Sequence, residues 1–307
     1  QCEQPSGSSD NDEDCDDDND DLYPYDSDGD GVDDACGWQQ VSAGGYHTCA
    51  LDSGGGVQCW GDDDYYQSSD TPTNSGYVIV GTGKYHSCAL GSSGAIECWG
   101  TNDVNGSVSD APTGSGYTHM TIGGYHGCVL DSTGTIECWG YDGYDEITDT
   151  PTGSGYIDVE AGYFHTCAIN SSREVECWGH DDYDQVTATP TSSGYTAVTA
   201  CDYHNCALDG SGAIECWGLD SVDQITDAPT SSGYTSITGG YGYSCALNSS
   251  TGIECWGYDG YYQVTDTPTD YGYKAVSAGT YHACSLDTDG AISCWGRDNY
   301  EQVTDIP

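Results

Sequence analysis

Cysteines at a regular spacing are the residues whose possible chemistry is clearest in this sequence. Fourteen of the 18 cysteines form pairs whose two members lie ten residues apart. The pairs are Cys49–Cys59, Cys88–Cys98, Cys128–Cys138, Cys167–Cys177, Cys206–Cys216, Cys245–Cys255 and Cys284–Cys294. Zinc knuckles use the tighter CxxC spacing, so these pairs indicate disulfides and not a metal site. Such cysteine usage also indicates an oxidising compartment.

Each cysteine pair lies in a segment that predicts a β-hairpin. From His47 to Gly61 the sequence reads HTCALDSGGGVQCWG, with a glycine-rich turn near Gly54 between two β-rich runs. A hairpin centred there places Cys49 opposite Cys59, within about 4.5–5.5 Å, which a disulfide can span. We therefore predict one disulfide per repeat, each worth ~2.5–3 kcal/mol.

Six histidines occupy one position of successive repeats, and Tyr243 takes that position in the sixth. They are His47, His86, His126, His165, His204 and His282. Catalysis needs one asymmetric site, whereas a residue repeated in every unit is typical of architecture. We therefore expect each imidazole to hydrogen-bond a backbone group of its own or the next repeat. No serine–histidine–aspartate order or phosphate-binding glycine loop accompanies them, so the sequence predicts no catalytic residues and no enzyme.

The repeat itself is the element that must position these residues. Tryptophans of seven CWG triplets recur every 39 or 40 residues, at Trp60, Trp99, Trp139, Trp178, Trp217, Trp256 and Trp295. Short β-rich runs alternate with Gly, Asp, Asn and Ser turns, which is typical of propeller blades. We predict an all-β, seven-bladed β-propeller over 37–307, with four strands per blade, the fourth near the QVTD segment. The repeats run over about 37–75, 76–115, 116–154, 155–193, 194–232, 233–271 and 272–307.

Two stretches carry a resemblance to a known family. SAGGYHTCALDSGGGVQCWG and EAGYFHTCAINSSREVECWG resemble the regulator-of-chromosome-condensation repeat superfamily, in its short form closest to the secreted bacterial propellers that inhibit β-lactamases. The resemblance covers 37–307 and implies a seven-bladed propeller that binds partners through loops on one face. It does not imply chromatin binding, because the net charge of -47 would repel a phosphate backbone.

Loops that follow the CWG triplets are rich in Asp and Tyr. In a propeller these loops share one rim, so we predict a partner-binding face there, against the alternative of a merely solvated surface. Its residues are Asp62, Asp63, Tyr65, Tyr66, Tyr141, Tyr144, Tyr183, Tyr258 and Tyr261. The tyrosines just before the histidines and the seven tryptophans are expected to pack. Asn105, Asn170 and Asn248 lie in glycosylation sequons.

Residues 1–36 form an acidic segment that predicts calcium binding. Carboxylates at alternate positions, a glycine for the turn and a following carbonyl make the start of a calcium loop. Its ligands would be Asp26, Asp28, Asp30, Val32 and Asp34, with a second site among Asp14, Asp16, Asp18 and Asp20. The segment resembles a thrombospondin type-3 calcium repeat, and calcium is the one cofactor expected.

Four cysteines lie outside the hairpin pairs. Cys15 and Cys36 flank the calcium loop and are expected to pair. Cys2 is left with Cys201, which replaces a glycine of the repeat. This bridge would form either within one molecule or between neighbours, and the second arrangement would chain subunits into a filament.

The net charge limits the functions that remain. No run of 18 apolar residues is present, so no membrane span is predicted, and nucleic acid is excluded as a partner. The start at Gln1 is expected to follow removal of a signal peptide, which makes the protein secreted, extracellular or at the cell surface. We rank first a structural protein that self-assembles into an extracellular filament or coat, with its own copies as partners. Next comes a monomeric binding module, an inhibitor or adhesin with an extracellular protein partner, and last a polysaccharide-active enzyme.

Overall fold

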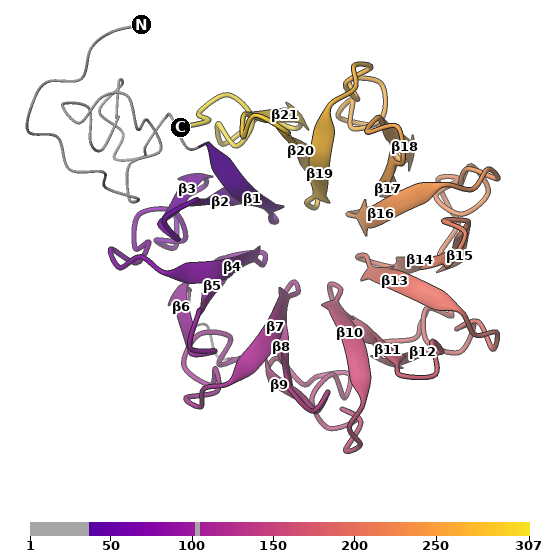
Figure 1. Cartoon of the computed structure of the whole chain (residues 1–307), viewed down its shortest axis with the longest axis horizontal. Helices are drawn as coiled ribbons and strands as arrows, with labels where there is room; N and C mark the ends of the chain where they lie inside the picture. The colour runs from indigo at the N-terminus through magenta and orange to yellow at the C-terminus, as the bar shows by residue number, and fades with distance from the viewer. Residues whose placement is uncertain (1–36, 102–104) are drawn as a thin grey trace, which may run out of the picture.

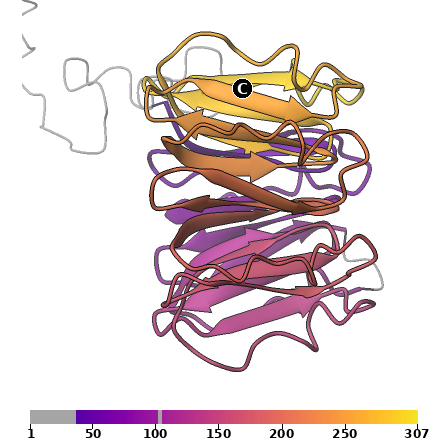
Figure 2. The same ribbon diagram turned by 90° about the vertical axis from the view of Figure 1, so that its right-hand side faces the viewer.

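The computed structural model describes residues 37–101 and 105–307, which form a ring of seven blades around a central axis (Figure 1). Each blade is a three-stranded antiparallel sheet in which chain order and spatial order agree. Seen from the side, the blades together form a disc, and their strands run across its thickness (Figure 2). All the regular structure in the described ranges is β-strand. The predicted all-β, seven-bladed propeller is confirmed.

The strands have nearly constant lengths. In blades 1 to 3 they are β1 (Trp38–Ala43), β2 (His47–Asp52), β3 (Val57–Gly61), β4 (Tyr77–Thr82), β5 (His86–Gly91), β6 (Ile96–Gly100), β7 (Tyr117–Ile122), β8 (His126–Asp131) and β9 (Ile136–Gly140). In blades 4 and 5 they are β10 (Tyr156–Ala161), β11 (His165–Asn170), β12 (Val175–Gly179), β13 (Tyr195–Ala200), β14 (His204–Asp209) and β15 (Ile214–Gly218). Blades 6 and 7 hold β16 (Tyr234–Gly239), β17 (Tyr243–Asn248), β18 (Ile253–Gly257), β19 (Tyr273–Ala278), β20 (His282–Asp287) and β21 (Ile292–Gly296).

The predicted fourth strand of each blade is wrong. The segment after the third strand is a loop of turns, because its own side chains bind the backbone donors that a sheet would need. In blade 6, Asp259 Oδ1 accepts from the Val264 and Thr265 amides, at 2.9 and 3.0 Å. Gln263 Oε1 accepts from the Tyr261 amide at 2.7 Å. The backbone is thereby folded back on itself and pairs with no strand.

The disulfide predicted for each blade is confirmed in all seven. Cys49 and Cys59 face each other directly in the register of β2 and β3, with Cα atoms 4.0 Å apart. The same pairing recurs in every other blade. Cys49 is fully buried and lies among side chains of the neighbouring blade. The bridge therefore fixes the hairpin and also contributes to the contact between blades.

The hydrophobic core is divided into small clusters, each formed by two adjacent blades. Leu51 of blade 1 packs with Val80 and Trp99 of blade 2. At the ring's closure, Leu286 of blade 7 packs with Val41 of blade 1 in the same way. Since apolar side chains are buried only where two blades meet, an isolated blade would lack a core.

The tryptophan of each CWG triplet is hydrogen-bonded to the loop that arrives from the preceding blade. Trp99 Nε1 donates to the Gln67 carbonyl at 3.0 Å, and the other blades repeat this bond. In blade 1 the acceptor is the Gln302 carbonyl at 3.1 Å, so the C-terminal loop takes the place of a preceding blade's loop. The ring closes by side-chain packing and hydrogen bonds, without an exchanged strand.

Cys201 corrects one disulfide prediction. Its side chain is 1 % exposed, it is a free thiol, and its sulfur lies 4.0 Å from Ser244 Oγ. The bridge to Cys2, proposed as a link within or between molecules, is therefore not formed, because the thiol is enclosed between blades 5 and 6. Cys2, the Cys15–Cys36 pair and all the calcium ligands lie outside the described residues and stay predictions.

Candidate functional site

One face of the ring carries the turns that join the first two strands of each blade. Consecutive turns are linked by backbone hydrogen bonds, beginning with the Gly45 amide to the Gly83 carbonyl at 2.9 Å. The series runs through every blade and closes with the Thr280 amide donating to the Gly44 carbonyl at 3.0 Å. These linked turns form a narrow, rigid mouth for the central channel.

Aromatic side chains surround this mouth in a nearly continuous belt. We call the face the tyrosine face; it combines the first turn of each blade with the start of the loop after the third strand. Ring centroids of neighbours lie 4.4–6.5 Å apart, within the range of stacked and edge-to-face contacts. The belt consists of Tyr46, Tyr65, Tyr85, Tyr125, Tyr141, Tyr144, Tyr163, Phe164, His180, Tyr183, Tyr203, Tyr241, Tyr258, Tyr261, Tyr281 and Tyr300.

Two of the four basic residues of the chain connect parts of the belt. Lys84 Nζ lies 5.1 Å from the Tyr85 ring centre and 5.2 Å from that of Tyr125, and donates to the Tyr125 and Tyr163 hydroxyls. Arg297 lies over four tyrosine rings, including Tyr46 and Tyr281. Although burial works to lower the pKa of Lys84, the two phenol hydrogen bonds hold it above its ordinary value.

The predicted partner-face residues divide into two groups. Tyr65, Tyr66, Tyr144, Tyr183 and Tyr261 are exposed, and Tyr141 and Tyr258 are half-buried against their neighbours. The two aspartates instead shape the loop, since both bind groups of their own loop.

Asp62 is buried and accepts from the Gln67 amide group at 3.0 Å. Asp63 accepts from the Ser68 and Ser69 amides, at 3.1 and 2.9 Å. Burial opposes the effect, yet these hydrogen bonds hold the pKa of Asp63 below its usual value. Both aspartates are therefore engaged within their own loop, and the predicted residues that remain available to a partner are the tyrosines.

The glutamine that ends each of these short turns was not singled out by sequence reasoning. Gln67, Gln185, Gln224, Gln263 and Gln302 are almost fully buried, and each accepts from the amide two residues earlier. The residue before the glutamine takes a left-handed backbone, as at Tyr66 with φ 63°. Glutamine seven residues after the CWG tryptophan is the signal that could have revealed the turn. In blade 3's loop Glu146 stands there, also fully buried.

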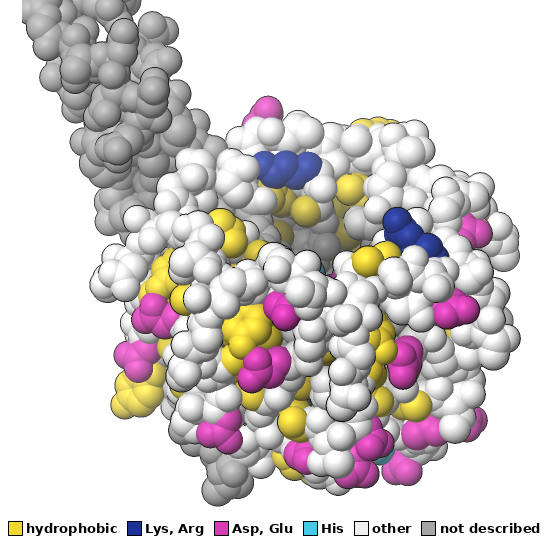
Figure 3. Space-filling view, turned by 60° about the horizontal axis from the view of Figure 1, so that its bottom comes forward, with side chains coloured by type: hydrophobic (Ala, Val, Ile, Leu, Met, Phe, Trp, Pro, Cys, Tyr) yellow, Lys and Arg dark blue, Asp and Glu magenta, His cyan; other side chains and the backbone are white. Residues whose placement is uncertain are grey.

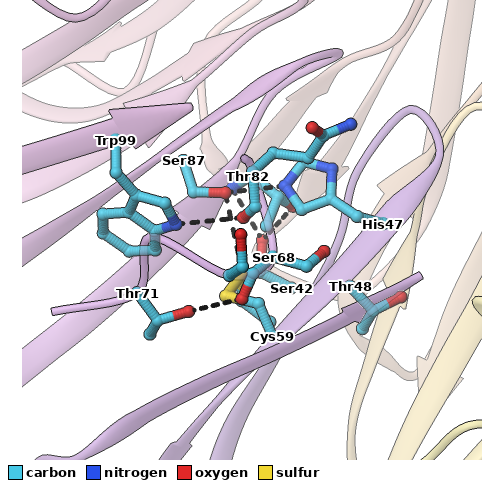
Figure 4. The surroundings of a disulfide bond; sticks show 12 residues. Ser42, His47, Thr48, Cys59, Ser68, Thr71, Thr82, Ser87 and Trp99 are labelled. Atoms are coloured by element: carbon cyan, nitrogen blue, oxygen red, sulfur yellow. Dashed lines mark hydrogen bonds between the residues drawn. A yellow bond between two sulfur atoms is a disulfide. The ribbon is translucent and has the colours of Figure 1, made fainter. Parts of the chain in front are cut away.

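The histidine column is architectural, but its partners differ from the prediction. Each bonded imidazole reaches a side chain of the next blade and not a backbone group, as His47 Nε2 does to Ser87 Oγ at 2.6 Å (Figure 4). Equivalent contacts join His126, His165, His204 and His282 to the following blade. Tyr243 alone in this column bonds backbone, donating to the Gly279 and His282 carbonyls.

His86 Nε2 has no such partner, because the equivalent position of the next blade is Gly127, which has no side chain to bond it. Burial lowers the pKa of His47 to about 3, and those of the other five histidines to about 3 or 4. These imidazoles are neutral and enclosed, which suits joining blades.

The central channel is the main hollow of the molecule, visible as the opening in Figure 3, and has a volume of about 610 Å³. Its wall is made by the first strand of each blade. At the third position of that strand stand Gln40, Ile79, His119, Asp158, Ala197, Ser236 and Ala275. At the fifth stand Ser42, Gly81, Thr121, Glu160, Thr199, Thr238 and Ser277. Titratable groups at these positions occur in two adjacent blades only.

His119, Asp158 and Glu160 lie together on that wall. His119 Nε2 is 3.9 Å from Asp158 Oδ1 and 3.9 Å from Glu160 Oε1. Burial, followed by the charge of Asp158, raises the pKa of Glu160. At the channel mouth, burial raises the pKa of Asp202 to about 7, and the Lys84 charge opposes that rise. The sequence prediction included none of these four groups.

Two of the glycosylation candidates, Asn170 and Asn248, lie on the face opposite the tyrosine face, where the second and third strands of a blade turn. Asn170 Oδ1 accepts from the Ser172 and Glu174 amides, and Asn248 Oδ1 does the same for Ser250 and Gly252. In three other blades an aspartate fills this role, as Asp131 does. The asparagines thus have a turn-forming role, and glycosylation at them or at Asn105 stays a prediction.

Comparison with known proteins identifies the class of propeller. The family model of the regulator of chromosome condensation (RCC1) repeat matches residues 38–67, 156–185 and 273–302, which lie in blades 1, 4 and 7. Repeats of this family are thus recognised in three of the seven blades, which supports an RCC1-like propeller. None of the curated proteins matches it. The closer resemblance to the β-lactamase-inhibiting propellers, and that of the N-terminal segment to thrombospondin repeats, stay predictions.

Solved structures of similar fold include receptor ectodomains. The entire ectodomain of the receptor kinase CR4 from Physcomitrella patens is 26 % identical, with a TM-score of 0.70 over 85 % of this chain and 74 % of that one. The CRINKLY WD40 ectodomain of the Arabidopsis thaliana receptor kinase ACR4 is 23 % identical, with a TM-score of 0.71 over 85 % and 97 %. Human WBSCR16 is 14 % identical, with a TM-score of 0.65 over 81 % and 86 %.

The seven disulfides indicate an oxidising compartment, and the ectodomains indicate an extracellular one. A search of the described residues finds no helix of the length and apolar character that crossing a membrane requires.

Proposed function

We propose that this chain is a non-enzymatic extracellular binding module that takes a protein partner on its tyrosine face. The observation that carries the proposal is the exposed part of the aromatic belt. Tyr65, Tyr183 and Tyr300 are 46 %, 43 % and 40 % exposed, on a face whose backbone is fixed by disulfides and turn-to-turn hydrogen bonds. Rigid tyrosines supply contact area at a small cost in conformational entropy.

The ectodomain neighbours support an extracellular binding role. CR4 and ACR4 are receptor kinases whose extracellular parts contain this propeller fold, which supports a protein partner for this chain. The net charge of -47 favours a partner with a basic surface and an affinity that falls as salt is added. Lys84 and Arg297 contact tyrosines of the belt, so these two positive charges do not alter the preference for a basic partner.

Two other functions have less support. Self-assembly into a filament was predicted partly from a disulfide through Cys201, and that thiol is buried and free. The repeated histidines are buried and hydrogen-bonded between blades, so they do not supply the accessible acid–base groups that an enzyme would need. Binding therefore remains the function that the face supports best.

Capture from secreted proteins tests the proposal. The disulfide-intact protein is immobilised and incubated with secreted proteins, and the captured partner is then titrated against variants. Tyr65→Ala and Tyr183→Ala are expected to weaken binding by about tenfold or more each. The matched control is Tyr271→Ala, because Tyr271 is 72 % exposed and pairs with Gly252 at the opposite face. Equal affinity of all three variants would exclude the tyrosine face as the binding site.

A further inference from the structure

The channel wall departs from the sevenfold repeat at one place. His119, Asp158 and Glu160 occupy positions that are neutral, and mostly small, in the five remaining blades. Residues that serve the architecture recur from blade to blade, as the histidine and tryptophan columns do. The fold therefore does not require this group of three unlike residues on two adjacent strands, β7 and β10.

The three side chains converge on one point. Their nearest ligand atoms all lie within 4.8 Å of one another, and Nε2 of His119 is 3.9 Å from each carboxylate. Two atoms that each lie about 2.1 Å from one ion can be up to about 4.2 Å apart. Small side-chain rotations are thus enough to bring all three donors to a common ion.

An independent observation shows that the cluster is incomplete. Nε2 of His119 is inaccessible to solvent and has no hydrogen-bond partner, although a buried polar atom normally has one. All four Lys and Arg residues of the chain lie in the described part, and none has a nitrogen within 4.0 Å of Asp158 or Glu160. The His119 ring nitrogen and the two carboxylates thus face one another without a hydrogen bond that joins them.

Neighbouring groups hold the carboxylates in place. Thr121 Oγ1 donates to Glu160 Oε2 at 3.1 Å, and the Val198 amide of blade 5 bonds Asp158. Such outer contacts orient the ligands of metal sites. His119 and Glu160 line the channel and their side chains are 36 % exposed, so an ion can enter and keep a free coordination position.

We propose that His119, Asp158 and Glu160 bind one divalent transition-metal ion in the channel wall. Imidazole favours Zn²⁺, Fe²⁺, Co²⁺ or Ni²⁺ over Ca²⁺ and Mg²⁺, which prefer oxygen ligands throughout. The site is separate from the tyrosine face and from the predicted calcium ligands. The inference therefore goes beyond the proposed function and can hold or fail without it.

Titration of Zn²⁺ into the chelator-treated, disulfide-intact protein tests the site. Calcium is kept in excess, so that acidic oxygen sites elsewhere are saturated. We expect one equivalent of Zn²⁺ to bind, with affinity reduced at least about tenfold in His119→Gln and in Glu160→Gln. His180→Gln is the matched control, because His180 also lies beside a carboxylate, 3.1 Å from Asp182, but has no second one. It is expected to leave the affinity unchanged.

The identity of the ligand is checked in the unaltered protein, which removes any dependence on how the variants fold. Zn²⁺ should shift the NMR signals of the His119 ring at one equivalent, and Co²⁺ should give a visible absorption band with nitrogen ligation. The proposal is overturned if His119 signals do not respond, if His119→Gln binds Zn²⁺ as tightly as the parent, or if binding needs millimolar metal.

Discussion

His282 Nε2 lies 2.7 Å from Thr48 Oγ1, so that the last blade of the ring is joined to the first by the same contact that joins the others. Both side chains are fully buried. Four further blades use the equivalent pair, and each pair connects residues about 40 positions apart in the chain. The closing pair connects residues 234 positions apart.

Removing the hydroxyl of this closing pair should destabilise the whole ring. Thr48→Val keeps the shape of the side chain but leaves both nitrogens of the His282 ring without a partner, since Nδ1 already lacks one. We expect the free energy of unfolding to fall by about 1–3 kcal/mol. Denaturant titration measures the change, and Thr152→Val at an exposed position should leave it unaltered. A loss below a few tenths of a kcal/mol at Thr48 would contradict an energetic role for the pair.

The six buried histidines predict that stability decreases in mild acid. Burial holds their pKa values at about 3 or 4 in the folded protein, against 6.5 when exposed. The unfolded chain therefore binds more protons below pH 6.5. Stability is fully present above that pH and falls as the pH drops toward the folded pKa values.

Between pH 6.5 and pH 5, we expect each such histidine to lower the free energy of unfolding by about 2 kcal/mol. Melting temperatures measured across this range provide the test. His204→Gln can still bond Ser244, and it should flatten the pH dependence if burial of the imidazole is its cause. A variant curve parallel to that of the parent would count against this explanation.

Glu146 predicts the opposite pH dependence at one site. Burial raises the pKa of its carboxyl, Oε2 accepts from the Tyr144 amide, and Oε1 is buried without a partner. The protonated form of Glu146 is favoured in the folded state. Its contribution to the free energy of unfolding is therefore present below the pKa of the unfolded state and is lost as the pH rises through the pKa of the folded state. Glu146→Gln should therefore stabilise the protein increasingly toward neutral pH.

The reciprocal change at an equivalent position provides the control for Glu146. Gln185 has the same buried turn position, with Oε1 accepting from the Tyr183 amide, so Gln185→Glu should destabilise toward neutral pH. Urea titrations at pH 4.5 and 7.5 compare the two variants. If both shift stability equally at the two pH values, the charge of the carboxyl is not the cause.

The hairpin disulfides should each contribute to stability without being accessible to reductant. Replacing Cys167 and Cys177 by alanine opens an 11-residue loop, and we expect a cost of about 2.5–3 kcal/mol in the free energy of unfolding. Because the Cys167 side chain is fully buried and Cys177 is half-buried, native protein should be reduced more slowly than protein in urea. Mass measurement after thiol labelling follows both reactions. Rapid labelling of the native protein would show that the blades open locally.

Most of the fold could be predicted from the repeat, because its signals are local. Cys49 and Cys59 flank a glycine-rich turn, so the hairpin, its register and its bridge follow from ten residues of sequence. The fourth strand was wrongly predicted because the β-branched residues after Gln263 resemble a strand. Their amides bind Asp259, and that side-chain competition is not visible in propensities.

The candidate sites were harder to predict for a geometric reason. His119 and Asp158 are 39 residues apart in sequence, and only the packing of blade 3 against blade 4 brings them together along the channel. Comparison of the repeats position by position would have marked both as exceptions to their columns. The aromatic belt was partly predicted, whereas the loop-forming role of Asp62 and Asp63 became evident only from the loop conformation.

Lys274 lies at the junction between blades 7 and 1 that closes the ring. Its ammonium group donates to the Trp38 carbonyl at 3.0 Å, so one of only four basic side chains lies where blade 7 meets blade 1. Bringing together points 234 residues apart, compared with 40, costs about 1.5 kcal/mol more in chain entropy. The final junction must overcome a greater loss of chain freedom than any other, with a contact that the other junctions do not share.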